Sequence, residues 1–480
     1  MKAILVLSSA LFFLSMSSFA WANQNPSQLV VRFKNSAPVR LNFASPEQAT
    51  AARAKLLLQS NVENVAPNFL YHLAISYHFH DVVHNVAQAM TYLAAPFAAL
   101  SNQSAMHTWD ESIQAPDVQP APENVVEGVD PLTGGDWAMG KIHMPSVDDV
   151  RGTQGSSTPI IAAVIDTGVD YNHEDLNGAM WRNPSNPQEV GYDFAHSSDK
   201  PFDIRHFDLD GCFKDDACKL GQDTGKFLTN PGHGTHCAGH VGAVANNSIG
   251  IRGVGGNVQV MALKFFYNAD ETNAGQGDDA AAVQSIDYAI QHGAKVISAS
   301  WGGRNERAAA EKSELKNALI RAQKAGVLVV IAAGNDSINQ DSDTQPDFPA
   351  AYQLDNLIIV AASDQNDQLA SFSNYGAQSV DIAAPGVKIL STTTGGTLYN
   401  DVVASYTDNN GNAHELDWDG TSMATPIVAG AAALVWSKYP DENYQQIKSR
   451  LMKSARQTSG LRGKVVTGGV LDVSAALESN

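Results

Sequence analysis

Short, uninterrupted apolar runs alternate with stretches of helical periodicity between residues 160 and 362 of this 480-residue chain. Runs of this kind, which lack polar alternation, are typical of strands that are covered on both faces of a sheet. Residues 279–292 and 311–325 repeat their apolar positions with the period of a helix. The alternation predicts an α/β domain, a parallel sheet with helices on both faces. The predicted strands are residues 160–165, 258–264, 295–299, 327–332 and 357–362.

The chain begins like an exported protein. Lys2 precedes an apolar run that reaches Met16, and Ala20-Trp21-Ala22 supplies the small residues expected before a signal peptidase site. The run is shorter than the roughly 20 apolar residues that span a bilayer. We therefore expect residues 1–22 to be a signal peptide and the protein to be secreted, either into a periplasm or into the medium.

A small module precedes the α/β domain. Residues 28–34 alternate like a strand, residues 46–59 are Ala-rich and helical, and residues 62–73 again look extended. We interpret residues 23–76 as an α+β module and residues 77–130 as an extension with a linker, followed by the main domain over 131–480. Residues 114–131 are rich in Pro and acidic side chains, which predicts an exposed linker.

Composition limits the partners. The chain has 50 acidic and 31 basic residues and a net charge of −19, which argues against nucleic acid or an anionic membrane as a partner. We expect a soluble monomer after signal removal. Of the three cysteines, Cys212 and Cys218 bracket an acidic loop and are able to pair in an oxidising compartment. Cys237 is left over, and we expect it to be a small buried residue rather than the nucleophile of a Cys-His dyad.

Three segments place an Asp, a His and a Ser in that order: Asp166-Thr167-Gly168, then Gly232-His233-Gly234-Thr235-His236, then Gly420-Thr421-Ser422-Met423-Ala424. A hydroxyl is a poor nucleophile at neutral pH, so it needs an imidazole to take its proton and a carboxylate to orient that imidazole. Asp166 and Asn335 directly follow predicted strands, whereas His233 and Ser422 precede helical stretches. Because ligands gather beyond the carboxyl ends of parallel strands, we expect these four side chains to meet on one rim.

With these motifs the chain resembles the subtilisin-like serine peptidases, the subtilases, over roughly residues 135–480. The resemblance implies a serine endopeptidase that forms an acyl-enzyme. It implies that Asp166 orients the imidazole, that His233 is the general base and then the general acid, and that Ser422 attacks the scissile carbonyl. Asn335, in Ala332-Ala333-Gly334-Asn335, would be the side-chain donor of the oxyanion hole.

Substrate binding is implied at Ser300-Trp301-Gly302-Gly303, which resembles the family's substrate-binding edge. Protein or peptide substrates would add a strand to Ser300, Trp301 and Gly302, so that main-chain hydrogen bonds give affinity and side-chain pockets give selectivity. An ordinary strand-to-loop turn is the alternative. The sequence does not reveal which side chains the pockets prefer.

A structural Ca²⁺ site is implied by residues 246–251, which resemble a calcium loop of many subtilases. Asp175 and Asn247 would supply side-chain oxygens, and the carbonyls of Ala245, Ile249 and Ile251 would complete the oxygen ligands that calcium prefers. A metal-free turn rich in Asn is the alternative. The acidic insertion over residues 203–225 lacks a complete ligand spacing, so we expect an exposed loop there rather than a second calcium site.

Residues 23–76 loosely resemble a subtilase propeptide, which assists folding and blocks the cleft until it is cut away. The extension over residues 77–130 departs from that pattern. The linker composition suggests processing between Ala105 and Asp130, which gives an inhibited precursor, a zymogen, as the primary product.

The same residues disfavour three other function classes. The triplets at 166–168 and 223–225 are both Asp-Thr-Gly, as in an aspartic peptidase, but those enzymes are β-rich and the second triplet has no strand before it. An esterase is disfavoured because Gly420-Thr421-Ser422-Met423-Ala424 breaks the Gly-x-Ser-x-Gly elbow. A binding module without activity would require a missing catalytic residue, and none is missing.

Overall fold

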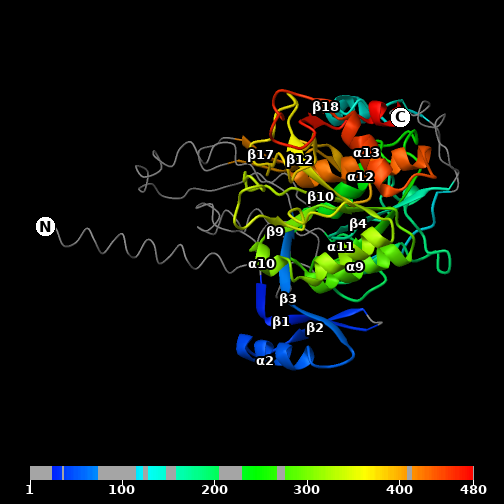
Figure 1. The fold of residues 1–480 in the computed structure, drawn as a ribbon. Coiled ribbons are helices and arrows are strands. Elements are labelled where there is room, and N and C mark those ends of the chain that lie inside the picture. Colours follow the sequence, from blue (N-terminus) through cyan, green and yellow to red (C-terminus); the bar gives the residue numbers. More distant parts are fainter. Residues whose placement is uncertain are drawn as a thin grey trace, which may run out of the picture.

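The computed structural model describes residues 24–34, 37–73, 115–122, 128–146, 158–204, 230–267, 276–407 and 413–478 (Figure 1). The expected signal peptide, Cys212, Cys218 and most of the expected extension over 77–130 lie outside the described residues. No helix in the described part is long and apolar enough to cross a membrane.

A nine-stranded sheet runs through the main domain as described, and its neighbouring strands are parallel except at one edge. The predicted α/β architecture is confirmed, and all five predicted strands are present within a residue or so of their expected bounds. In order across the sheet the strands are β18 (Arg456–Gln457), β19 (Gly469–Val470), β13 (Ile382–Pro385), β12 (Leu357–Ser363), β10 (Leu328–Ala332), β8 (Val296–Ala299), β4 (Ile160–Asp166), β6 (Val258–Lys264) and β5 (Gly191–Asp193).

Helices cover both faces of this sheet, because each strand sends alternate side chains into two separate cores. In β4, Val164 belongs to one core and Ile165 to the other. The first core lies under α8 (His233–Gly242) and α12 (Thr421–Lys438), and the second lies under α9 (Asp279–Gln291) and α11 (Glu314–Lys324). Figure 1 shows α12 and α9 on opposite sides of β10 and β4.

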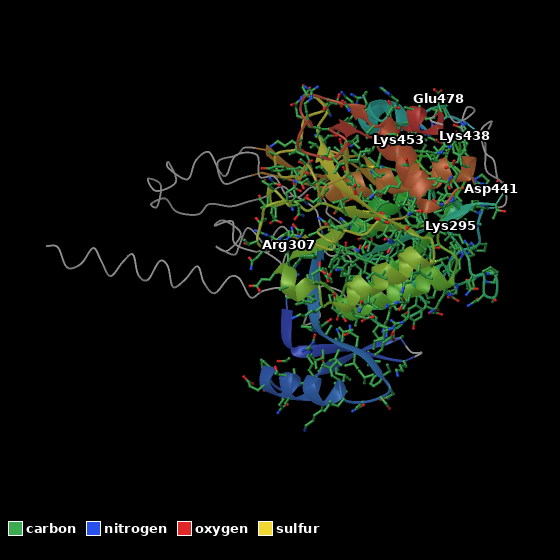
Figure 2. All side chains as sticks on the ribbon, in the orientation of Figure 1. Lys295, Arg307, Lys438, Asp441, Lys453 and Glu478 are labelled. Atoms are coloured by element: carbon green, nitrogen blue, oxygen red, sulfur yellow. The ribbon has the colours of Figure 1, made fainter. Side chains whose placement is uncertain are left out.

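Helix α12 is buried from Thr421 to Ser437, which explains why its sequence is apolar on every side. Charged side chains such as Lys438, Lys453 and Glu478 stay at the periphery, as Figure 2 shows. The shorter elements are η1 (Thr133–Gly135), α4 (Trp137–Lys141), η2 (Asn177–Ala179), α10 (Arg307–Ala310), β11 (Asp347–Phe348), β14 (Ser391–Thr393), β15 (Leu398–Asn400), β16 (Val402–Thr407), β17 (Ala413–Asp417), α13 (Tyr444–Ser454) and α14 (Val473–Glu478).

The amino-terminal module is a small antiparallel sheet with one helix, as expected. Its elements are β1 (Gln24–Phe33), β2 (Pro38–Asn42), α2 (Pro46–Leu56) and β3 (Val62–Leu73). Strand β1 lies between β2 and β3, and Ser45 caps α2 by accepting a hydrogen bond from the Gln48 amide. The far end of β3 leaves the module and pairs with β7 (Gly277–Asp278) and β9 (Trp301–Arg304) of the main domain, as the blue strand in Figure 1 shows.

Part of the expected linker is fixed to the domain surface. Val118 is buried in the first core, the Gln119 amide donates to Asn172 Oδ1 (2.8 Å), and the Tyr171 hydroxyl donates to the Pro116 carbonyl (2.6 Å). Asn172 Nδ2 in turn donates to the Asp117 carbonyl at 2.9 Å. Residues 115–122 are mostly exposed, as expected. Their attachment to the domain surface was not predicted, because composition does not reveal backbone hydrogen bonds to distant side chains.

Candidate active site

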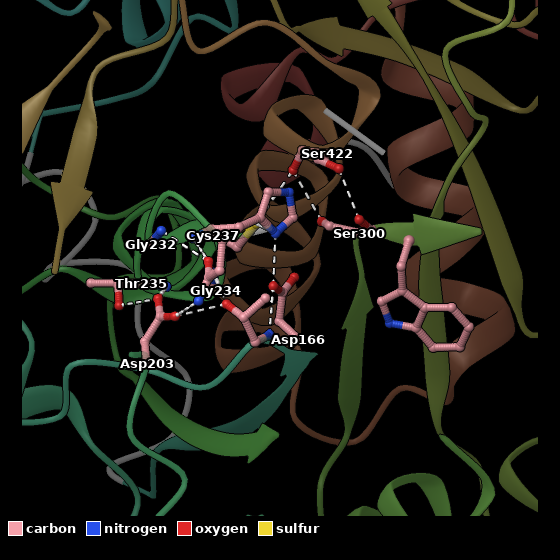
Figure 3. Close-up of polar contacts among 12 residues, drawn as sticks. Asp166, Asp203, Gly232, Gly234, Thr235, Cys237, Ser300 and Ser422 are labelled. Carbon is pink, nitrogen blue, oxygen red and sulfur yellow. Dashed lines mark hydrogen bonds and ion pairs between the residues drawn. The ribbon is translucent and has the colours of Figure 1, made fainter. Parts of the chain in front are cut away.

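Asp166 and His233 meet at the rim of the sheet. Asp166 is the last residue of β4 and His233 is the first of α8, and the His233 Nδ1 to Asp166 Oδ1 distance is 2.7 Å (Figure 3). Both side chains are almost fully buried. The Thr167 amide also donates to Asp166 Oδ1 (2.8 Å), which fixes the carboxylate. The imidazole is thus oriented by a carboxylate, as the sequence predicts.

Asp203 adds a second carboxylate to this site, although the sequence placed it at the start of an exposed loop. That prediction was wrong for Asp203, because its carboxylate is completely buried. It accepts hydrogen bonds from the hydroxyls of Thr167 (2.9 Å) and Thr235 (2.6 Å), from the Thr235 amide (2.9 Å) and from Asn230 Nδ2 (2.7 Å). Asp203 therefore ties the segment after Asp166 to the first turn of the helix that carries His233, where a negative charge is favourable.

Ser422 is the second residue of α12, so its backbone amide lies at the positive end of a helix. Its hydroxyl donates to the carbonyl of Ser300 at 2.8 Å (Figure 3). Among the described residues, His233 Nε2 has no hydrogen-bond partner. The Asp-His contact is therefore made in this structure, while the Ser422 hydroxyl is directed at Ser300 rather than at the imidazole.

Pro426 affects the hydrogen bonds that the Ser422 backbone makes. Pro426 is the sixth residue of α12 and therefore lies inside the helix. A proline here cannot donate to the carbonyl four residues earlier, which is that of Ser422. The Ser422 carbonyl instead accepts from the Ser300 hydroxyl (3.0 Å) and the Cys237 thiol (3.6 Å). Segments from α12, α8 and the end of β8 therefore meet at one carbonyl.

Cys237 is buried on α8, as expected. Burial raises the pKa of its thiol well above the usual value, and the nearby Asp166 carboxylate adds to this. A thiol held in its protonated form is a weak nucleophile. Its role here is that of a hydrogen-bond donor.

Asn335 lies after β10 and is anchored by its side-chain oxygen. Oδ1 accepts from the amide (3.0 Å) and the hydroxyl (2.9 Å) of Thr421, the residue before Ser422. The amide nitrogen Nδ2 is buried and has no partner within the described part of the chain. Because Oδ1 is anchored, Nδ2 is positioned in advance and is able to donate to a negative charge that develops only during a reaction.

The predicted substrate edge is already paired with a strand. In the antiparallel register, His72 of β3 lies opposite Gly302 and Leu73 lies opposite Trp301. The Trp301 side chain itself is buried, and its Nε1 donates to the Ile165 carbonyl at 2.8 Å. Ser300, which precedes β9, offers its carbonyl to Ser422.

The predicted calcium loop brings two buried carboxylates together. Asp175 accepts from Asn247 Nδ2 (2.7 Å) and from the Ile251 amide (3.0 Å), and Asp130 accepts from the amides of Asn246 (2.8 Å) and Asn247 (2.9 Å). Burial raises the pKa of Asp175 to about 7, and the charge of Asp130 contributes. The sequence did not identify Asp130, whose only signal was its place just ahead of the domain.

These residues fit a hard cation. A pair of buried carboxylates at one loop leaves negative charge that a calcium ion would neutralise. The carbonyls of Ala245, Ile249 and Ile251 accept no hydrogen bond from the described residues. Asn247 at present donates its amide nitrogen to Asp175, so its oxygen would reach an ion only after the amide turns.

Comparisons with known proteins agree with this geometry. Residues 157–468 match the profile of the subtilase family of peptidases. The chain is 35% identical over 320 residues to thermitase from Thermoactinomyces vulgaris, covering 67% of this chain and 88% of the relative. It is 37% identical over 308 residues to a thermophilic serine proteinase from Bacillus sp. (strain AK1), covering 64% and 59%. It is 40% identical over 224 residues to subtilisin DY from Bacillus licheniformis, covering 47% and 70%. The chain therefore belongs to the subtilase family, and it is a subtilisin-like serine endopeptidase.

Proposed function

We propose that the chain is a secreted zymogen that cuts peptide bonds through Asp166, His233 and Ser422, and that residues 23–76 block its cleft until they are removed. The observation that carries the proposal is the 2.7 Å contact between Asp166 and His233 Nδ1, which leaves Nε2 of the same buried ring without a partner among the described residues. Such a ring is ready to accept a proton at Nε2.

In the proposed reaction a substrate strand lies along β9, and the Ser422 hydroxyl turns from the Ser300 carbonyl to His233 Nε2. Oγ attacks the carbonyl carbon as its proton passes to the imidazole, and Asp166 stabilises the resulting cation. Asn335 Nδ2 and the Ser422 amide donate to the oxyanion. His233 then protonates the leaving amine, and water releases the acyl group from Ser422 by the same proton path in reverse.

The place of β3 supports the inhibitory role of the module. Its end occupies the edge that a substrate would use, directly beside the carbonyl that binds Ser422. The surface contacts of residues 115–122 support a mature enzyme that keeps this segment, with processing ahead of Ala115 within the region from Ala105. Export by the segment 1–22, a monomeric state and the absence of nucleic-acid or membrane partners remain part of the proposal.

We also propose a structural calcium ion held by Asp175, by Asn247 after its amide turns, and by the carbonyls of Ala245, Ile249 and Ile251, with Asp130 as an additional carboxylate. When bound, the ion would neutralise the buried acidic charge and fix the loop. It takes no part in the chemistry at Ser422.

Inhibition separates the proposed mechanism from the aspartic alternative. The matured protein should hydrolyse casein, lose that activity to a serine-directed phosphonate, and keep it in pepstatin. The opposite inhibition pattern would contradict a serine nucleophile. Absence of casein hydrolysis by protein that has lost residues 23–76 would contradict the proposed function itself.

A further inference from the structure

Strand β3 lies in the cleft as a substrate would. It is inserted between β7 and β9 and is antiparallel to both, with Tyr71 opposite Gly277 and Leu73 opposite Trp301. The residue before Trp301 is Ser300, whose carbonyl accepts from the Ser422 hydroxyl. We take the substrate residue opposite Ser300 to be the one directly before the cleaved bond. The substrate residues opposite Trp301 and Gly302, at the positions of Leu73 and His72, are then the second and third. Tyr71 therefore occupies the position of the fourth residue on the amino side of that bond.

The Tyr71 side chain fills a pocket in the main domain, which we call the Tyr71 pocket and define by Asp279, Trp301 and Ser313. Tyr71 is only 1% exposed, and its ring lies 5.2 Å from the Trp301 ring, at an angle of 54°. The Trp301 ring therefore forms an aromatic wall that suits a large planar side chain.

A carboxylate closes the Tyr71 pocket. The Tyr71 hydroxyl donates to Asp279 Oδ1 at 2.5 Å, and the Ser313 hydroxyl donates to Asp279 Oδ2 at 2.6 Å. Asp279 is fully buried at the first position of α9, and burial raises its pKa to about 7. With a phenylalanine in place of Tyr71, the buried oxygen Oδ1 would lose this partner, which is costly.

We propose that Asp279 makes the enzyme selective for tyrosine, over phenylalanine, at the fourth substrate residue before the cleaved bond. The inference rests on the proposed function and names a feature of its substrates. A pocket built to hydrogen-bond a hydroxyl rejects the analogue that lacks it, whereas a purely apolar pocket discriminates poorly between the two. Docking of the module alone would not require a hydroxyl acceptor at this depth, because the Trp301 ring already offers apolar contact.

Two peptides test the selectivity. Both carry His-Leu-Ala, the sequence of residues 72–74, followed by a chromogenic p-nitroanilide; one begins with Tyr and the other with Phe. For matured wild-type enzyme we expect kcat/KM to be roughly 10- to 100-fold higher for the tyrosine peptide. In Asp279→Leu the ratio should fall to about one, because the acceptor is gone and an apolar side chain replaces it. Asp279→Asn keeps an oxygen acceptor and should keep a preference for tyrosine.

The ratio is measured within each variant, so a lower yield of folded enzyme cancels. If Asp279→Leu does not mature, the double variant Tyr71→Phe/Asp279→Leu removes both partners together and supplies the same measurement. Equal kcat/KM for the two peptides on wild-type enzyme, or an unchanged ratio in the Leu variant, overturns the inference, as does cleavage of casein without cleavage of either peptide. Failure to cleave casein as well would contradict the proposed function instead.

Discussion

The main domain buries its core with its own helices, whereas the amino-terminal module does so only in part. The main domain covers both faces of its sheet with its own helices. The module covers one face with α2, over a core of Leu29, Val31, Ala49 and Val65. On the opposite face Val30 and Ala66 are fully buried as well, although α2 does not cover that face. The main domain supplies the missing cover, so part of the module's core belongs to its partner.

Charged contacts connect the two regions. Arg32 lies 2.8 Å from Asp287 of α9, and Arg40 lies 2.5 Å from Asp278, which caps the same helix. Asn64 donates to Glu314 in the first turn of α11 at 2.6 Å. A small domain that buries little apolar area alone gains stability from such a partner. Docking on the main domain therefore also completes the core of the module.

The largest effect is expected when the chemistry of the main domain is disabled and the module is left unchanged. Ser422→Ala should lower turnover by about a million-fold, the loss measured for the corresponding change in subtilisin. The purified variant should also keep residues 23–76 attached, as intact-protein mass spectrometry would show. Removal of the module in a preparation free of other peptidases would contradict self-processing.

Substitutions of Asn335, the proposed oxyanion donor, test the contribution of the main domain to kcat. Asn335→Ala should reduce kcat by about 10²–10³-fold with little change in KM, the range found for the equivalent subtilisin residue. Asn335→Asp is the matched control for anchoring, because it keeps the oxygen that accepts from Thr421 but lacks the amide donor. Both variants should be slow. Wild-type kcat in the Asp variant would show that Asn335 acts through its anchor.

Arg32 and Arg40 of the module are expected to strengthen its binding to the main domain. Arg32→Ala or Arg40→Ala in an isolated module should raise its inhibition constant against mature enzyme by roughly 10-fold or more, because each leaves a largely buried carboxylate with fewer partners. Lys55→Ala is the control, since Lys55 is exposed on α2, which faces away from the main domain (Figure 1). Equal inhibition constants for all three variants would mean that apolar contact alone holds the module.

Metal removal should affect the main domain without weakening the module directly. Chelation by EDTA should lower the melting temperature of the mature enzyme by on the order of 5 °C, because an ion that binds only the folded state stabilises it. Asp175→Asn should largely abolish this difference. A melting temperature that does not respond to calcium in the wild-type enzyme would leave the Asn-rich turn as the correct interpretation.

Local patterns predicted the fold well because the strands are buried on both faces. The bounds expected for β6 are those observed, and the helix expected at 279–292 ends one residue earlier. Strand β13 was not predicted, because Ile382–Pro385 is short and ends in a proline that is typical of loops. The residues of the proposed triad and Asn335 were identifiable as candidates because small residues flank each of them in compact motifs.

The remaining site residues depend on contacts between distant segments. Asp203 reads as one acid among many in an acidic loop, and only the fold shows that it binds Thr167 and Thr235. Asp279 looks like an ordinary acidic residue at a helix start, where such residues are common. Its contact with Tyr71 links residues 208 positions apart, which no local pattern encodes.

The pairing of β3 with β9 affects when the proposed zymogen becomes active. In the proposed zymogen, residues 23–76 are an inhibitor on the same chain, so their local concentration does not depend on how many other molecules are present. Once the chain is cut between the module and the main domain, this local concentration is lost. Rebinding of the module then depends on the volume into which the protein is released. Activation of the proposed zymogen therefore depends on protein concentration. After cleavage the module stays bound at high concentration, and it dissociates and frees the active site when the protein is diluted.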